Sequence, residues 1–258
     1  MYDELSSDYD RFVNWPSRLA LELPFLHTEL SQNGARRVLD SACGTGQHAI
    51  ALAKLGFEVV GTDASAPMIE VARKNAAGQS GIRFRVAAFG HMHAAVGGGF
   101  DAVLCLGNSL PHVLERESVG EALVDMATCL RPGGLLIIQN RNFDRVVTRK
   151  ERWMEPQSRS EGDHEWLFLR FYDWEPDGLV GFNMVTLRRQ GSGPWSQRVS
   201  HSLLRPQLRG ELESALTSAG FAQTRAYGDL AGSAFDPLSS GNLVIVGALS
   251  APAIRDPT

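Results

Sequence analysis

The sequence predicts an α/β fold, with a mostly parallel, doubly wound sheet that carries helices on both faces. One observation is a stretch, 37–63, that reads as strand, glycine-rich turn, helix and strand. Another is the return of apolar strands further along the chain, at 82–86, 100–106, 135–144, 221–227 and 243–249. Since 258 residues are enough for one large domain, we expect these strands to form a single seven-stranded sheet.

The chain begins with an amphipathic helical region, residues 1–33, which we expect to lie over the site as a lid. Aromatic and apolar residues recur in it at helical spacing: Tyr2, Tyr9, Phe12, Trp15, Leu19 and Leu23. Pro16 should break the first helix or open the second, because proline suits the first turn of a helix and disrupts its interior. Arg18 is a candidate partner for a ligand carboxylate, and the alternative is a solvated surface arginine.

The glycine-rich turn carries the strongest functional signal. The strand 37–39 ends at Asp40, and Gly44 and Gly46 follow, which let the backbone come close to a ligand and adopt positive φ. The second strand ends at Asp63, about 20 residues after the turn, where a carboxylate can bind both hydroxyls of a ribose. The sequence therefore predicts a nucleoside site at the carboxyl edge of the sheet.

A dinucleotide site is the nearest alternative. Its fingerprint is G-x-G-x-x-G, and Ala49 stands at the third glycine position, which the pattern tolerates. Asp40, however, precedes Gly44 by four residues and would face the phosphates of a dinucleotide. S-adenosylmethionine (SAM) has no phosphate, and an acid can lie beside its aminium group because the charges are opposite.

The segment Asp40–Gly46 matches the pattern D-x-A-C-G-T-G fully and resembles motif I of the class I methyltransferases, which use SAM. The resemblance implies a Rossmann-like fold and SAM as the methyl donor. It also implies a set of cofactor-binding residues: Arg18, Asp40, Ala42, Gly44, Gly46, Asp63, Ala64, Met68, Ala88, Phe89 and Leu106. The family usually carries an acid after the third strand, to hold the adenine amino group. Here that stretch has no acid, so we expect backbone groups and Phe89 to hold the adenine, with Met68 packed on its face.

Polar residues also follow the fourth and fifth strands. Asn108 and His112 come after the fourth strand, and Arg141 comes after the fifth. Open α/β sheets bind ligands at this edge, so these side chains are expected at the reaction centre. The guanidinium of Arg141 offers a planar fork to a carboxylate, and the alternative is a pairing with a structural acid.

Further segments are similar to the glycine N-methyltransferases and their glycine/sarcosine relatives: Leu106–Ser109, Arg131–Leu136 and Arg141–Asp144. The resemblance implies that Arg141 holds the acceptor carboxylate, that Asn108 assists it, and that Arg18 pairs with the carboxylate of SAM. That family lines its pocket with several tyrosines, whereas this chain has four in all. Glycine itself is therefore an open question as the substrate.

We expect a single domain, whose segments differ in their sequence pattern. Residues 1–33 form the helical lid and 34–150 the SAM-binding core. Residues 151–205 contain alternating strands that predict an inserted antiparallel β cap over the pocket. Residues 206–250 supply a final helix, 206–219, and the last two strands, expected as a hairpin. The tail, 251–258, is expected to be disordered.

Composition limits the partners. The net charge is −4 with no basic stripe, which argues against nucleic acid as a substrate. No apolar run reaches about 18 residues, so no membrane span is expected. Three cysteines without a C-x-x-C motif indicate neither a disulfide framework nor a metal site. We expect a cytoplasmic protein, and an oligomer is possible.

These features predict methyl transfer from SAM to a small-molecule acceptor, with the amine of an amino acid such as glycine or sarcosine expected. Positioning should carry most of the rate, and His112 is the candidate general base. The alternatives are an O- or C-methyltransferase of a larger metabolite, a nicotinamide oxidoreductase, and a non-catalytic SAM-binding module.

Overall fold

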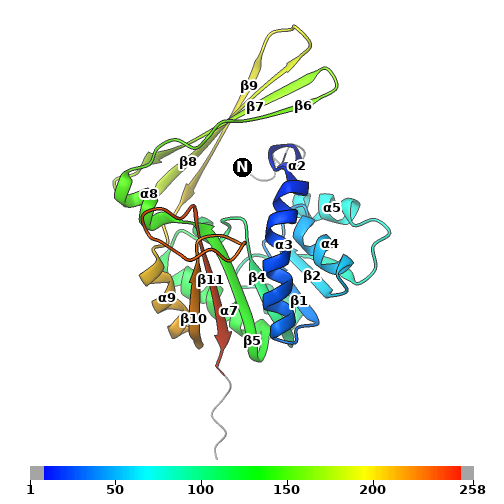
Figure 1. The fold of residues 1–258 in the computed structure, drawn as a ribbon, viewed down its shortest axis with the longest axis vertical. Helices are drawn as coiled ribbons and strands as arrows, with labels where there is room; N and C mark the ends of the chain where they lie inside the picture. Colours follow the sequence, from blue (N-terminus) through cyan, green and yellow to red (C-terminus); the bar gives the residue numbers. More distant parts are fainter. Residues whose placement is uncertain (1–8, 251–258) are drawn as a thin grey trace, which may run out of the picture.

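The computed structural model describes residues 9–250, which form two separate sheets and the helices around them (Figure 1). The strands of the main sheet are β1 (Arg37–Ser41), β2 (Glu58–Asp63), β3 (Ile82–Val86), β4 (Phe100–Cys105), β5 (Leu130–Arg141), β10 (Phe221–Tyr227) and β11 (Asn242–Leu249). Their order is β10-β11-β5-β4-β1-β2-β3. All neighbours from β5 to β3 are parallel, and β11 is antiparallel to both β5 and β10. The predicted seven-stranded, mostly parallel sheet is confirmed.

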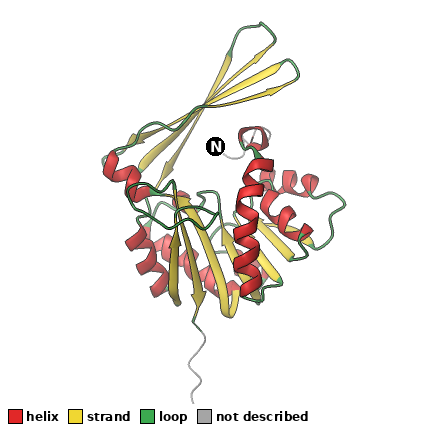
Figure 2. Cartoon of the chain, viewed as in Figure 1, coloured by secondary structure: helices red, strands yellow, loops and turns green. Residues whose placement is uncertain are grey.

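Helices cover both faces of this sheet (Figure 2). One face carries α3 (Trp15–Gln32), α4 (Gln47–Lys54) and α5 (Ala66–Asn75). The other carries α6 (Met92–Val96), α7 (Arg116–Cys129) and α9 (Arg209–Ser218). Each face has its own cluster of buried apolar side chains, so strands such as β1 and β4 are buried along nearly their whole length.

The second sheet is the inserted cap. It contains β6 (Gln157–Glu161), β7 (His164–Trp174), β8 (Val180–Gln190) and β9 (Ser196–Leu204), joined in that order as an antiparallel meander. It follows α8 (Phe143–Arg149), which leaves the end of β5. Figure 1 shows the cap leaning over the carboxyl ends of the parallel strands. A small cluster that includes Phe143, Tyr172 and Leu204 joins its base to the core.

The N-terminal region lies between the cap and the core. It contains α2 (Tyr9–Phe12) and α3, and Pro16 falls in the first turn of α3, as predicted. The side chain of Asn14 caps this helix by accepting a hydrogen bond from the Ser17 N–H. Toward the cap, the ring of Phe12 packs edge-on against Phe168 at 5.4 Å. The region therefore closes one side of the space under the cap.

Several predicted boundaries shift. The helix expected at 206–219 begins at Arg209, because Leu208 is extended and acts as its N-cap. The helix α7 ends at Cys129, since Leu130 already belongs to β5. The sequence analysis missed α6 and α8, which are short, and β6, which is exposed throughout and has no apolar alternation.

Two predictions fall outside the described residues, namely the role of Tyr2 in the lid and the disorder of 251–258. Between residues 9 and 250, none of the helices is both long and apolar enough to span a membrane.

Candidate active site

Two cavities adjoin at the carboxyl ends of the parallel strands. The glycine-loop cavity has a volume of about 370 Å³, and its walls include Gly44, Asp63, Met68, Ala88, Phe89 and Val113. The cap cavity has a volume of about 300 Å³, and its walls include Arg18, Asn108, Arg141, Arg170, Tyr172 and Met184. Gly107 and His112 line both cavities, so two ligands bound there would meet across these residues.

Backbone groups hold the carboxylate of Asp63 at the end of β2. Its Oδ2 accepts a hydrogen bond from the Gly44 N–H at 2.9 Å, and its Oδ1 accepts one from the Ser65 N–H at 2.9 Å. A carboxylate oxygen accepts more than one hydrogen bond. Asp63 can therefore also accept from two neighbouring hydroxyl groups of a ligand in the glycine-loop cavity.

Gly44 and Gly46 both have positive φ, +54° and +81°, but they serve different contacts. A Cβ on Gly44 would meet nothing within 4 Å, and this residue lines the glycine-loop cavity. A Cβ on Gly46 would lie 2.8 Å from Cζ of Phe84 and 3.0 Å from Cβ of Ala72. Gly46 therefore lets the turn pack against β3 and α5. Its approach to the cofactor stays a prediction.

Asp40 lies beneath the turn and is 2% exposed, and its Oδ2 has no hydrogen-bond partner among the described residues. Burial, and then the nearby charge of Asp63, raises the pKa of Asp40 to about 7. A small cavity of about 30 Å³ is lined by Asp40 together with Arg18 and Leu106. The other oxygen of this carboxyl group accepts a hydrogen bond from the backbone of Ala49, so Oδ2 is the atom that a cationic ligand group would satisfy, stabilising the charged form.

The other predicted cofactor residues gather around the same space. Ala42, Ala64, Met68, Ala88 and Phe89 line the glycine-loop cavity. Met68 is 2% exposed and forms part of the apolar floor, as an aromatic base would require. The walls thus combine an acid at one end with an apolar slot at the other.

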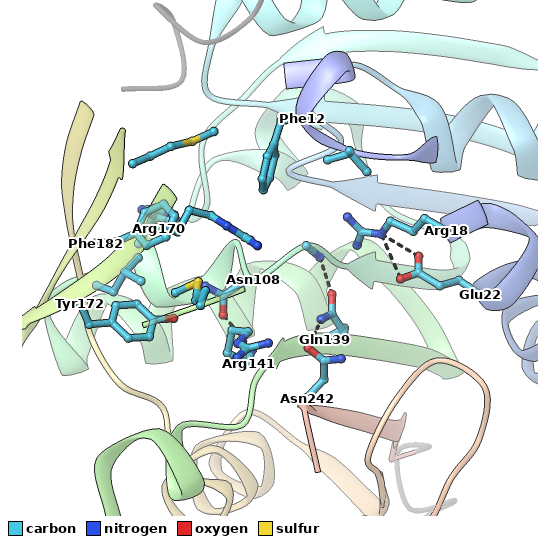
Figure 3. Close-up of a pocket in the computed structure, with 16 residues that line it drawn as sticks. Phe12, Arg18, Glu22, Asn108, Gln139, Arg141, Arg170, Tyr172, Phe182 and Asn242 are labelled. Atoms are coloured by element: carbon cyan, nitrogen blue, oxygen red, sulfur yellow. Dashed lines mark hydrogen bonds and ion pairs between the residues drawn. The ribbon is translucent and has the colours of Figure 1, made fainter. Parts of the chain in front are cut away.

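Arg18 is held by an acid one turn further along α3. Its Nε donates to both carboxylate oxygens of Glu22, at 3.0 and 3.1 Å, and Glu22 lies 2.6 Å from Nε2 of His48. Burial alone would raise the pKa of Glu22, but the bonds with His48 and Arg18 lower it. Burial lowers the pKa of His48, so a neutral ring faces an ionised acid. The terminal nitrogens of Arg18 remain on the cavity side (Figure 3). The sequence analysis missed Glu22 and His48.

Asn108 and Arg141 lie together, as the sequence predicted. Oδ1 of Asn108 accepts a hydrogen bond from the Arg141 backbone N–H at 2.9 Å, and the Asn108 N–H donates to the Gln139 carbonyl at 3.1 Å. Oε1 of Gln139 accepts from the Gly107 N–H at 2.8 Å. These bonds tie the end of β4 to the end of β5, and Asn108 takes a φ of +65° to make them. The cavity floor is therefore rigidly positioned.

The guanidinium of Arg141 has no acid partner among residues 9–250, and its Nε is buried without a hydrogen-bond acceptor. Its contact in the site is the hydroxyl of Tyr172, which accepts a hydrogen bond from it. Burial raises the pKa of Tyr172, although Arg141 opposes the shift, so the phenol stays neutral. The alternative that Arg141 pairs with a structural acid does not hold for the described part of the chain.

The cap adds residues that the sequence analysis missed. Arg170, Tyr172 and Phe182 reach the cavity from β7 and β8, opposite Asn108 (Figure 3). Alternation placed these strands correctly, but no motif marks which of their side chains face the core. Only the docking of the cap brings them to the site.

His112 lies in the short 3₁₀ turn Leu110–His112 that follows β4, on the wall that both cavities share. Burial lowers the pKa of His112 to about 4. The imidazole is therefore neutral at physiological pH. It can exchange hydrogen bonds with a ligand without adding positive charge to the site.

Asp10 fixes the N-terminal region to the glycine-rich turn, a contact that the sequence analysis also missed. Its Oδ1 accepts from the Thr45 hydroxyl at 2.6 Å and from Nε1 of Trp15 at 2.8 Å. Its Oδ2 accepts from Nδ2 of Asn75 at 3.1 Å. The lid is thereby coupled to the loop that begins α4.

Across the described residues, no three His, Cys, Asp or Glu side chains converge in a way that could hold a metal ion.

Comparison with known proteins agrees with this geometry. Residues 38–134 match the family model described as a methyltransferase domain. The glycine/sarcosine N-methyltransferase of Parasynechococcus marenigrum (strain WH8102) is 30% identical over 243 residues, which cover 88% of this chain and 77% of that protein. The glycine/sarcosine N-methyltransferase of Aphanothece halophytica is 30% identical over 222 residues, 86% of this chain and 79% of its own.

A similar fold occurs in the crystal structure of an S-adenosylmethionine-dependent methyltransferase from Clostridium acetobutylicum ATCC 824. Its TM-score is 0.78 at 15% identity, covering 97% of this chain and 99% of that one. The fold and site therefore define a class I methyltransferase, an enzyme whose methyl donor is SAM. Within that class, the chain belongs to the family of the glycine/sarcosine N-methyltransferases. This membership excludes the alternative of a nicotinamide oxidoreductase.

Proposed function

We propose that the enzyme methylates the amine of an amino acid, such as glycine or sarcosine. The observation that carries the proposal is Arg141: its guanidinium lines the cap cavity, and no acid among the described residues pairs with it. A planar fork of this kind binds a carboxylate through two parallel hydrogen bonds. The relatives at 30% identity, named for glycine and sarcosine, support the same acceptor class.

The residues of the glycine-loop cavity fit SAM. Asp63 would accept from the ribose hydroxyls, Met68 and Phe89 would flank the adenine, and the open space at Gly44 would admit the ligand against the backbone. The orphaned Oδ2 of Asp40 would lie near the aminium group, and Arg18 would meet the carboxylate. Asp40 would thus lie near a positive charge of SAM, and Asp63 near neutral hydroxyl donors.

SAM supplies an electrophilic methyl group: the neutral amine forms the N–C bond as the C–S bond breaks, the electron pair stays on sulfur, and the methylated ammonium gives its proton to solvent. The protein contributes position. Arg141 and Asn108 would fix the acceptor carboxylate at the end of β5, and alignment of this kind can supply a large part of the rate. His112, neutral and on the shared wall, would accept a hydrogen bond from the amine and so orient its lone pair.

An acceptor screen tests the proposal. Formation of S-adenosylhomocysteine would be measured with glycine, sarcosine, other amino acids and amines that lack a carboxylate. We expect turnover with amino acids and at least about tenfold lower kcat/KM with the matching decarboxylated amines. A best acceptor without a carboxylate would overturn the proposal and favour an O-, C- or N-methyltransferase of another metabolite.

A further inference from the structure

A second guanidinium, that of Arg170, lines the cap cavity opposite Arg141 (Figure 3). Its Nε is buried and has no hydrogen-bond partner within residues 9–250. Its Nη2 makes one long contact, 3.5 Å, with the backbone oxygen of Glu155. The group also lies 4.7 Å from the centre of the Phe12 ring. Its charge is therefore only weakly compensated by the protein.

The acids near the cap cavity are already engaged. Glu22, the acid among the described lining residues, binds Arg18 and His48. Glu151, which lies near Tyr172, forms an ion pair with Arg145 at 2.9 Å. Burial lowers the pKa of Arg170, and the like charge of Arg141 lowers it further. Two neighbouring cations without acids are costly in a partly buried site unless a ligand supplies the anions.

We propose that the acceptor carries two acidic groups, one for Arg141 and one for Arg170, and that it is an amino dicarboxylic acid of the size of aspartate or glutamate. The inference rests on the proposed function, since it assumes that Arg141 binds the α-carboxylate, but it replaces glycine or sarcosine, which have one carboxylate, with an amino acid that has two. A cavity of about 300 Å³ is at the lower end of the roughly 300–1,000 Å³ that small-molecule sites occupy, which suits an amino acid with a short side chain. Apolar neighbours such as Met184 and Phe182 would flank its methylene groups.

The competing explanation is that Arg170 only supports the wall. In that case its contact with the Phe12 ring would hold the N-terminal region in place, and its removal would affect all acceptors alike. The two explanations differ in one measurable quantity, namely the preference for a side-chain carboxylate over the isosteric amide.

The experiment compares aspartate with asparagine and glutamate with glutamine, beside glycine and sarcosine. Both kcat/KM and the dissociation constant in the presence of S-adenosylhomocysteine are measured, so that binding is read without turnover. We expect the wild-type enzyme to favour the acids over the amides by at least about tenfold, because a charge-assisted pair is replaced by a neutral contact. Arg170→Met should bring the ratio close to one, and Arg170→Lys should restore part of it.

Arg188→Met is the matched control, because Arg188 is another cap arginine over an aromatic ring, Trp166, but does not line the cavity. It should leave the acid-to-amide ratio unchanged. Phe12→Leu should lower acids and amides by the same factor. If Phe12→Leu instead brings the acid-to-amide ratio close to one, as Arg170→Met does, Arg170 affects the preference only by supporting the cavity wall. The inference then fails.

Other outcomes separate this inference from the proposed function. Suppose that the wild-type enzyme turns over glycine well and has a ratio of kcat/KM for acids over amides near one. This result would refute the proposal that Arg170 binds a second acidic group, and it would leave the amino-acid proposal intact. Failure of every carboxylate-bearing acceptor to bind or react would overturn both.

Discussion

The glycine-loop cavity and the cap cavity adjoin, yet the protein builds them in different ways. The first is formed largely by consecutive pieces of one βαβ unit and the strand after it, and backbone N–H groups hold its main acid, Asp63. The second is assembled from α2, α3, the ends of β4 and β5, and the cap. The difference shows that the glycine-loop cavity is a property of local sequence, whereas the cap cavity depends on how distant segments dock.

The two cavities also differ in charge. Asp63 in the glycine-loop cavity and Asp40 in the small cavity beside the glycine turn make that side acidic, whereas Arg141 and Arg170 bring positive charge to the cap cavity. This division suits a cationic methyl donor beside an anionic acceptor, because each ligand is attracted to its own cavity and repelled from the other. Variants that change ligand binding in one cavity alone would support this division of charge. Variants that change ligand binding in both cavities would contradict it.

The largest effect is expected for Asp63→Ala. The loss of two charged hydrogen bonds to ribose, at about 1.5–3 kcal/mol each, should weaken SAM binding about 100-fold or more. Isothermal calorimetry measures this constant. Asp101→Ala is the control, because Asp101 accepts two backbone N–H bonds at 2.8 Å, from Arg36 and Arg37, but does not line either cavity. It should cost stability without changing SAM affinity, and equal affinities for the two variants would refute the role of Asp63.

Next in size is the contrast between Gly44→Ala and Gly46→Ala. Both residues have positive φ, so each alanine costs about 1 kcal/mol of backbone strain. Gly46→Ala should lose about 1–3 kcal/mol more in the free energy of unfolding, because its Cβ overlaps the Phe84 ring. Gly44→Ala should instead lose SAM affinity. Urea unfolding measures the free energy of unfolding, and calorimetry measures the SAM affinity. Loss of SAM affinity in Gly46→Ala and of stability in Gly44→Ala would mean that Gly46 is the ligand contact.

A smaller effect is expected for Arg141→Lys. Lysine keeps the charge but not the bidentate fork, so kcat/KM for the best carboxylate acceptor should fall by at least about tenfold, or about 1.4 kcal/mol. SAM affinity should hardly change, since Arg18 and Asp63 serve that ligand. Steady-state kinetics with saturating SAM measures the first quantity and calorimetry the second. Full activity of Arg141→Lys would contradict the proposal that Arg141 binds a carboxylate of the acceptor.

The smallest effect concerns pH. Because the pKa of Asp40 in the empty protein is about 7, only a fraction of the protein carries an ionised Asp40 below that pH. We expect SAM, which is cationic, to bind the ionised form more tightly. SAM affinity should therefore rise by about tenfold or less between pH 6 and pH 8. Asp40→Asn should lack this rise, and the ratio of wild-type to variant affinity removes the titration of the ligand's own amine. A ratio that is independent of pH would contradict the coupling of SAM binding to the ionisation of Asp40 in this range.

The stability of the empty protein should depend on pH in the opposite direction to the SAM affinity. A carboxyl group whose pKa rises on folding stabilises the empty protein fully below its unfolded pKa, 3.8, and this contribution is lost as the pH rises toward 7. SAM should restore it. Thermal unfolding with and without SAM at several pH values would record both trends.

The contrast between the cavities also explains what the sequence could predict. Strand ends, the glycine turn and Asp63 follow from short-range patterns, and the fold class follows from their alternation. Asn108 and Arg141 could be found because parallel strands bring their carboxyl ends to one edge. Arg170 could not, because an alternating strand does not reveal which of its faces will meet the core. The packing of Gly46 on Phe84 was missed for a related reason, since the two are brought together only by the crossover.

The walls that the cap contributes have a practical consequence for protein engineering. Met154, Tyr172, Phe182, Met184 and Leu204 all line the cap cavity, and none lines the glycine-loop cavity. A library restricted to such positions would explore new acceptors while every contact to the methyl donor stays constant. The insertion after β5 is therefore a natural unit for directed evolution, separable from the glycine-loop cavity.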